Sequence, residues 1–105
     1  MKILKELCSI HAPSGEENQI SKYIINYINK NMNTWKTRPT LYYGKGFQDC
    51  IVLCFGVPRT AIYAHMDSIG FTVKYNNEII KIGGPVTDEN ILLVGNDSIG
   101  QIEGK

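Results

Sequence analysis

The sequence lacks the features that mark nucleic-acid-binding, membrane-surface and disulfide-rich proteins. Eleven Lys and Arg residues stand against ten Asp and Glu residues, which leaves a formal net charge of +1. Because no basic run is present either, the chain has no electrostatic footprint for nucleic acid or an acidic membrane. Its three cysteines are an odd number and form no paired extracellular pattern. We therefore expect free thiols and a cytoplasmic location.

Long apolar runs are also missing. The longest, residues 51–57 and 61–64, fall far below the ~20 residues that cross a bilayer. Met1 is followed at once by a charged, amphipathic segment instead of the apolar core of a signal peptide. Of the 105 residues, 43% are hydrophobic and 20% are charged, which is typical of a soluble globular protein. This length allows at most one small domain.

Two helices are predicted at the start of the chain. Apolar residues recur at helical spacing across residues 2–11, and the pattern ends before Pro13, because the residue preceding a proline is pushed out of the α region. Ser14 and Glu17 form a capping-box pattern, which predicts that Ser14 caps a second helix. Its apolar stripe fades at residues 29–31.

The rest of the chain has strand patterns separated by turn residues. Continuous apolar runs favour strands that are covered on both faces, whereas alternating runs favour strands with one exposed face. The last two strands form a hairpin that needs more sheet, or a partner, to be stable. The fold class expected is α/β, with two helices and then a mixed sheet. The predicted strands are residues 34–43, 50–55, 60–65, 69–75, 78–82, 91–94 and 98–103, with turns at Gly44-Lys45-Gly46, Asn76-Asn77 and Gly95-Asn96-Asp97.

His65 and Asp67 are the candidate site residues. They straddle the end of a predicted apolar strand, and ligands bind at the carboxyl ends of strands in open α/β sheets. A neutral imidazole is a good ligand for first-row metals, and it usually needs a neighbouring carboxylate to fix its tautomer and orientation. A His-x-Asp sequence is common by chance, so a structural reading and a metal-binding reading both stay open.

The remaining histidine and two of the cysteines have simpler interpretations. His11 lies at a helix end beside a proline, which favours a partly exposed capping or surface residue. Cys50 and Cys54 would lie on one face of a strand about 13 Å apart, too far for one zinc ion or a disulfide. We expect both thiols to pack in the core.

Two blocks resemble the glutamyl, deblocking and tetrahedral aminopeptidase family, whose members are co-catalytic metallopeptidases. Residues 4–17 are similar to the family's opening helix and Pro-Ser-Gly-x-Glu turn. Residues 64–73, Ala-His-Met-Asp-Ser-Ile-Gly-Phe-Thr-Val, resemble its Ala-His-Met-Asp-Glu-Ile-Gly-Phe-Met-Val block, and Ile82-Gly83-Gly84 matches the Ile-Gly-Gly that follows. Both blocks stand in the expected order. Ser68 departs from the family's usual Glu.

The resemblance implies an enzyme that removes N-terminal residues from short peptides with two divalent metal ions, zinc or cobalt. His65 would bind one metal, and Asp67 would orient His65 without binding metal itself. The family's other ligands and its general base lie later than any residue here, so we expect this chain to be inactive alone. Residues 1–80 would begin the catalytic domain. Residues 81–105 would begin an inserted β-rich domain that assembles the complete protein into homo-oligomers.

Two alternatives remain. The chain could be a catalytically silent α/β module that associates through exposed β edges, as the unfinished hairpin of residues 91–103 suggests. It could also be part of a related metallo-carboxypeptidase or deacylase, because those hydrolases share a His-x-Asp at an equivalent place. Met66 and the run Ile69-Gly70-Phe71 favour the aminopeptidase branch.

Overall fold

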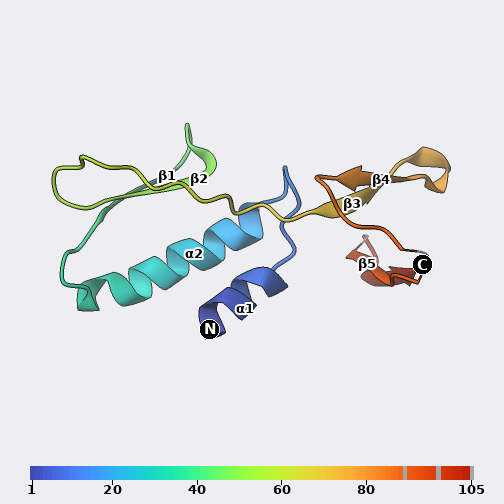
Figure 1. Cartoon of the computed structure of the whole chain (residues 1–105), viewed down its shortest axis with the longest axis horizontal. Helices are drawn as coiled ribbons and strands as arrows, with labels where there is room; N and C mark the ends of the chain where they lie inside the picture. Colours follow the sequence, from blue (N-terminus) through green and yellow to red (C-terminus); the bar gives the residue numbers. More distant parts are fainter. Residues whose placement is uncertain (89, 97, 105) are drawn as a thin grey trace.

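The N-terminal third of the chain is helical, as the sequence predicts. A computed structural model describes residues 1–88, 90–96 and 98–104. Helix α1 spans Lys2–Ser9, helix α2 spans Asn18–Asn31, and the short 3-10 helix η1 follows at Met32–Thr34. Figure 1 shows α1 and α2 on the same side of the chain, joined by the connection that contains Pro13. The tyrosine hydroxyl of Tyr23 in α2 donates a hydrogen bond to the Glu6 carboxylate in α1.

The predicted cap of the second helix is wrong. Helix α2 begins at Asn18 with Glu17 in the cap position, and no side chain caps it. Ser14 lies instead in a turn that is closed by a hydrogen bond from Glu16 N–H to the Pro13 carbonyl, 2.8 Å. Gly15 has a φ of 93° in this turn, so the helix cannot start before the turn ends.

The next two strands form an antiparallel hairpin, and its predicted turn is confirmed. Strand β1, Thr40–Gly44, pairs with strand β2, Gln48–Cys54, across a turn at residues 45–47. Gly44 and Gly46 both have a φ of 92°, a conformation that glycine adopts without steric cost. Helix α2 packs against β2 and lies under this hairpin in Figure 1.

Only one face of β2 is covered, so the prediction of a strand covered on both faces is wrong. Along β2, exposed residues alternate with partly covered ones, and Val52 is 46% exposed. Cys50 is exposed and Cys54 is only partly covered, which corrects the expectation that both thiols lie in the core. The physical reason is that α2 packs on one side of this hairpin, and the described elements provide no comparable layer on the other side.

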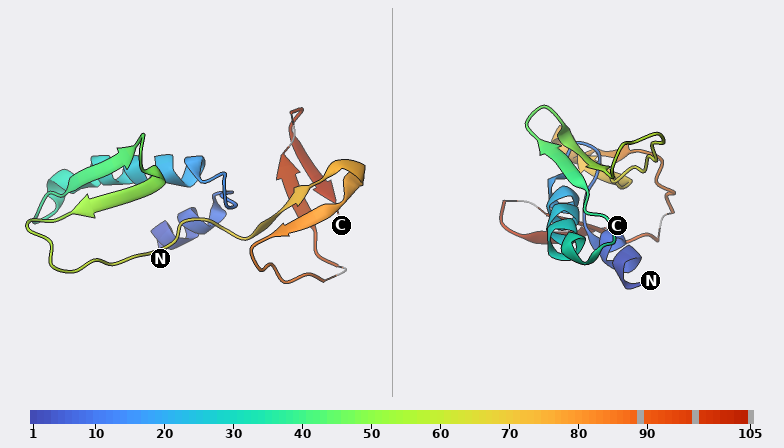
Figure 2. Two further views of the ribbon diagram at one scale, coloured as in Figure 1. Left: turned by 90° about the horizontal axis from the view of Figure 1, so that it is seen from above. Right: turned by 90° about the vertical axis from the view of Figure 1, so that its left-hand side faces the viewer.

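Residues 60–65 form no strand, contrary to the sequence prediction. Within the described part of the chain, the backbone of residues 60–64 makes no hydrogen bond. Ile62 is 95% exposed and Tyr63 is 91% exposed. A strand exists only when a neighbour accepts its backbone hydrogen bonds, and no described segment lies where it could do so. The left view of Figure 2 shows this segment running apart from the β1–β2 hairpin.

Two further antiparallel hairpins follow. Strand β3, Gly70–Val73, pairs with strand β4, Ile79–Ile82, and strand β5, Leu93–Asn96, pairs with strand β6, Gln101–Gly104. The turn predicted at Asn76-Asn77 is confirmed, with φ values of 67° and 59°, because Asn tolerates the left-handed region. Of the turn predicted at Gly95-Asn96-Asp97, the first two residues belong to β5, and Asp97 lies outside the described residues.

Six of the seven predicted strands have a counterpart in the structure, residues 60–65 being the exception, and the predicted arrangement of the strands is wrong. The described strands form three separate two-stranded antiparallel sheets, not the single mixed sheet that was expected. Helices and strands are both present, so the chain contains mixed α and β structure. Among residues 1–88, 90–96 and 98–104, the one parallel pairing is an isolated bridge between Pro13 and Ser68.

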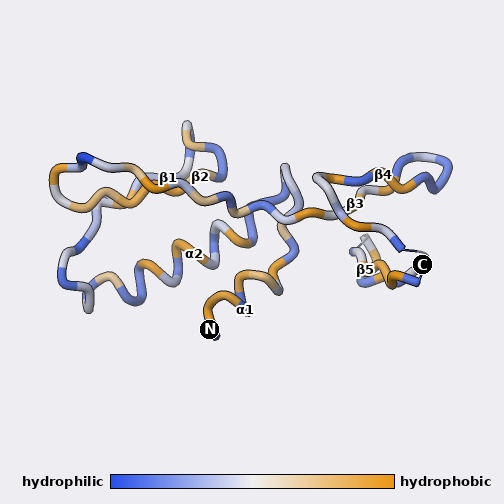
Figure 3. Tube along the Cα trace, viewed as in Figure 1, coloured by the Kyte–Doolittle hydropathy of each residue, from blue (hydrophilic) through white to orange (hydrophobic). Residues whose placement is uncertain are grey.

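The molecule is elongated and buries little apolar surface. Its principal dimensions are 52 × 29 × 27 Å, and its radius of gyration is 17.1 Å, against about 13 Å for a compact domain of this length. The buried apolar side chains of the core are Ala12, Ile20 and Ile28. In Figure 3, apolar stretches lie on β2 and on the segment after it. No described helix has the length and apolar character to span a membrane.

Candidate functional site

His65 and Asp67 are in contact, as the sequence predicts. The His65 Nδ1 atom lies 3.1 Å from the Asp67 Oδ1 atom and 3.0 Å from the Asp67 backbone oxygen. Both of these oxygens are acceptors, so Nδ1 carries the proton and Nε2 carries the lone pair of the neutral ring. The side chain of His65 is 86% exposed, and that of Asp67 is 42% exposed. The Nε2 lone pair is therefore available to a ligand from solvent.

The local backbone explains how the pair is held. Residues 61–67 belong to no helix or strand, but the chain is fixed directly after Asp67. There Ser68 N–H donates to the Ala12 carbonyl at 2.7 Å, and Ala12 N–H donates to the Ser68 hydroxyl at 3.3 Å. Ala12 is completely buried. The pair thus sits between an unpaired extended segment and an anchored bridge.

A cleft of about 250 Å³ has His65 and Asp67 in its wall. The same cleft is lined by Glu17 from the start of α2 and by Asp49 and Cys50 from β2. The wall of this cleft thus contains three carboxylates, one thiol and one imidazole, which are types of side chain that bind divalent cations. The cleft therefore has the electrostatic character of a cation site.

The cleft does not form a complete metal centre. Among the residues described, no group of three or more His, Cys, Asp or Glu side chains is placed to hold one metal ion. His65 fits the role of a single ligand, because its Nδ1 has acceptors and its Nε2 is open. The remaining ligands of a zinc or cobalt ion have no counterpart in the described geometry.

Sequence patterns did not indicate that Glu17, Asp49 and Cys50 share a cleft with His65. Glu17 fits a capping-box pattern, but its Oε1 atom accepts a hydrogen bond from Gly15 N–H at 3.0 Å. Cys50 lies in an apolar run that favours burial, and yet it is exposed. The Pro13–Ser68 bridge brings the start of α2 close to the His65 segment, and a single isolated bridge leaves no periodic signal in a sequence.

His11 is separate from this cleft. It is exposed, as expected, and it makes no hydrogen bond within the described residues. It does not line the cleft that contains His65.

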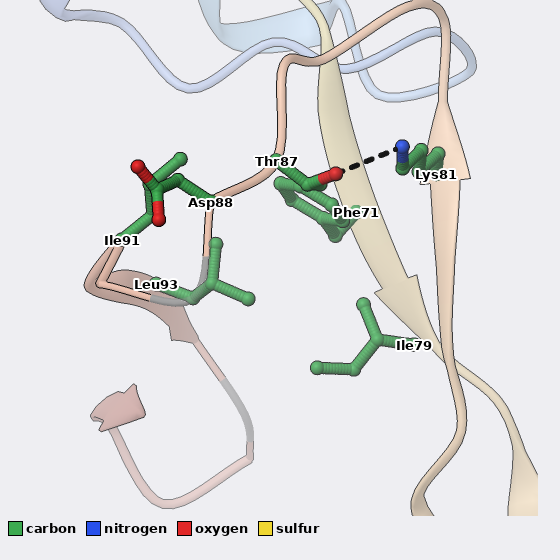
Figure 4. Close-up of a pocket in the computed structure, with 7 residues that line it drawn as sticks. All are labelled: Phe71, Ile79, Lys81, Thr87, Asp88, Ile91 and Leu93. Carbon is green, nitrogen blue, oxygen red and sulfur yellow. Dashed lines mark hydrogen bonds between the residues drawn. The ribbon is translucent and has the colours of Figure 1, made fainter. Parts of the chain in front are cut away.

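A second cavity, of about 230 Å³, lies between the β3–β4 hairpin and the segment that leads to β5. Figure 4 shows Phe71, Ile79 and Leu93 around its apolar part, and Lys81 Nζ donating to the Thr87 hydroxyl at 3.1 Å. This cavity contains no cysteine or histidine. Its third polar lining residue, Asp88, accepts a hydrogen bond from Asn90 N–H at 3.3 Å through its own Oδ1 atom.

No protein-family model matches the sequence, and a search of curated proteins finds no significant match. The resemblance to the aminopeptidases therefore stays a prediction from the two sequence blocks.

Proposed function

We propose that this chain forms the first metal-binding corner of a two-metal aminopeptidase, an enzyme that removes N-terminal residues from short peptides. His65 supplies one ligand to a zinc or cobalt ion, and Asp67 orients the imidazole. The single observation that carries the proposal is the hydrogen-bonded contact between His65 Nδ1 and Asp67 Oδ1, with the ring open to solvent. This is the arrangement by which a carboxylate fixes a metal-binding histidine.

The surroundings support the same proposal. The cleft beside His65 is lined by three carboxylates and has no Lys or Arg in its wall. A cation would therefore meet favourable charge at the open Nε2 atom. When bound, a pair of such metals polarises a peptide carbonyl and activates water. This chain contributes one ligand and its orienting group, so we expect it to bind metal weakly and to hydrolyse no peptide alone.

The division of the chain stays a prediction. Residues 1–80 are proposed as the beginning of the catalytic domain and residues 81–105 as the beginning of an inserted β-rich domain that forms homo-oligomers. The boundary falls within β4, Ile79–Ile82. A related metallo-carboxypeptidase or deacylase would use His65 and Asp67 in the same way, and Met66 with Ile69-Gly70-Phe71 favours the aminopeptidase.

Calorimetric titration of the full chain with zinc or cobalt tests the metal assignment. We expect weak binding that falls at least tenfold in His65→Ala, because this substitution removes the ligand itself. His11→Ala is the matched control, because it removes an imidazole that is also exposed but lies outside the cleft. Strong binding that does not change in His65→Ala, or an equal loss in His11→Ala, would contradict the assignment.

A second candidate function is supported by the exposure of residues 60–65. This module would be catalytically silent and would associate by pairing its open β edges. The chain exposes 9007 Å² of surface, whereas a folded monomer of 11.8 kDa exposes roughly 5900 Å². Ile62 and Tyr63 stand almost fully in solvent, and unpaired apolar strands invite a partner strand.

Size-exclusion chromatography with light scattering separates the two candidates. A silent self-pairing module would form a stable dimer or larger assembly, and Ile62→Pro would dissociate it, because proline removes a backbone donor and does not fit a central strand. A monomer at high concentration would eliminate the second candidate. That result would leave the zinc titration as the test of the first.

A further inference from the structure

We propose that Ser68 is a positioning residue, which orients the His65 imidazole through the peptide group that joins Asp67 to Ser68. The statement that the oriented His65 ring binds a metal rests on the proposed function. The orienting role itself concerns only the imidazole and the backbone, so it can be tested without metal. Ser68 is also the position at which this sequence departs from the aminopeptidase block.

The key observation is that one peptide group has partners on both of its sides. Its carbonyl oxygen, from Asp67, lies 3.0 Å from His65 Nδ1. Its N–H, from Ser68, donates to the Ala12 carbonyl at 2.7 Å. Because the peptide group is planar and rigid, fixing its N–H also fixes the direction of its carbonyl oxygen. The anchor at Ala12 therefore determines where the Nδ1 proton of His65 is directed.

The serine hydroxyl completes the anchor. Ser68 Oγ accepts a hydrogen bond from Ala12 N–H at 3.3 Å, so two hydrogen bonds join these residues in opposite directions. Ala12 is fully buried and Pro13 beside it is also buried, which makes the anchor point rigid. A Cβ atom built on Gly70 would lie 3.4 Å from the Pro13 Cβ atom, so the chain on the far side of Ser68 also packs closely on the same point.

Without the hydroxyl, the buried Ala12 N–H would have no acceptor among the described residues. A buried donor without a partner is unfavourable, and the bridge would open to let water reach it. Opening the bridge frees the Asp67–Ser68 peptide group to rotate, and rotation removes one of the two acceptors that hold the Nδ1 proton. We therefore expect the imidazole to lose its single tautomer when the hydroxyl is lost.

Long-range ¹H–¹⁵N spectra of the metal-free full chain test this role. In the native protein at a pH where the ring is neutral, His65 is expected to carry its proton on Nδ1. In Ser68→Ala the two ring-nitrogen shifts should move toward the averaged values of a free imidazole. Ser68→Thr keeps the hydroxyl and should restore the native shifts. Ser14→Ala is the matched control, because Ser14 is exposed and its hydroxyl makes no hydrogen bond to any of the residues that the structure describes.

Three results would overturn the proposal: native His65 shifts in Ser68→Ala, an equal change in Ser14→Ala, or no restoration in Ser68→Thr. Amide exchange of the native chain gives a test that needs no variant. The Ala12 amide should exchange more slowly than the Ser14 amide, and equal rates would contradict the anchor. If the chain bound no zinc, the proposed function would be contradicted. The orienting role of Ser68 would still be tested by these measurements, because they are made without metal.

Discussion

At the scale of single residues, the chemistry depends on how the two nitrogens of one imidazole are used. His65 directs Nδ1 toward two oxygens of Asp67 and leaves Nε2 open. The His65 side chain is 86% exposed, so solvent competes for contacts with the ring. An exposed contact of this kind contributes little to folding, so under the proposed function we expect the Asp67 carboxylate to affect metal affinity more than stability.

Asp67→Ala is expected to lower the zinc affinity of the chain by about tenfold and to leave its thermal stability unchanged, because a group that orients a ligand has this order of effect. Zinc titration calorimetry measures the first quantity, and a thermal melt measures the second. Asp88→Ala is a suitable control, because Asp88 lies outside the His65 cleft. An unchanged affinity in Asp67→Ala would show that the carboxylate does not support the ring.

Tyr23 provides a pH-dependent contact between the two helices. The hydrogen bond that its hydroxyl donates to Glu6 raises the pKa of Tyr23 above its ordinary 10.0, with smaller contributions from partial burial and from the nearby negative charge of Glu6. The folded chain thus binds this proton more tightly than the unfolded chain. The stabilisation is fully present below pH 10, and it is lost as the pH rises through the raised pKa of Tyr23.

Tyr23→Phe is therefore expected to lower the melting temperature at pH 7, and its difference from the native chain should shrink as the pH rises above 10. Circular dichroism melts at a series of pH values measure this. Tyr63→Phe is the control, because Tyr63 is 91% exposed and its hydroxyl has no partner in the described residues. Equal melting of Tyr23→Phe and the native chain at pH 7 would contradict the assignment.

At the scale of elements, the sequence predicted secondary structure well where the backbone hydrogen bonds of a segment are made within it or with its neighbour in sequence. Helix α2 and the β3–β4 hairpin agree with their patterns, because the helix satisfies its backbone internally and the hairpin pairs with its neighbour in sequence. The Asn76-Asn77 turn needs only two residues that accept a positive φ. These features require no distant part of the chain, so they can be read from the sequence.

Patterns that depend on distant partners were less reliable. Residues 60–65 have the composition of a buried strand, but burial needs an element on each face and none is present among the described residues. Within the candidate site, the contact between His65 and Asp67 was predicted, because the two residues are only two positions apart in the sequence. The anchor at Ala12, 56 positions away from Ser68, was not predicted. Such a contact is fixed by tertiary structure alone.

Gly83 shows how one position can determine the geometry of an element. It follows β4 with a φ of 77°, and an added Cβ atom would lie 3.0 Å from Ile69 Cγ2. Gly83→Ala is expected to destabilise the β3–β4 hairpin by about 1–2 kcal/mol, because a side chain disfavours this conformation. Gly84→Ala is the matched control, because it meets no atom within 4 Å. Amide exchange across β3 and β4 gives the measurement, and equal effects would contradict the claim.

At the scale of the whole molecule, an elongated shape and a large exposed surface follow from the same cause. Three hairpins that do not share a sheet cannot enclose a common core. The apolar residues that would fill such a core, including Ile62 and Tyr63, remain in solvent. Both proposed functions give these residues a partner, either further parts of a hydrolase or another polypeptide.

Because isoleucines differ widely in burial, the same substitution is expected to change the free energy of unfolding by different amounts at different positions. Ile28 of α2 is 4% exposed, whereas Ile62 is 95% exposed. Ile28→Ala is expected to cost about 2 kcal/mol in unfolding free energy, at the lower end for a buried position because the core is small. Ile62→Ala is expected to stay within about 0.5 kcal/mol. Urea denaturation of both variants measures the difference, and a large cost at residue 62 would mean that this segment is covered in solution.

The most direct measurement of the central claim is a zinc titration followed at the nitrogens of both histidines by long-range ¹H–¹⁵N spectroscopy. The account predicts that Nε2 of His65 shifts as zinc binds, that Nδ1 keeps its proton beside Asp67, and that His11 does not respond. A response at His11 alone, or zinc replacing the proton on Nδ1 of His65, would contradict it.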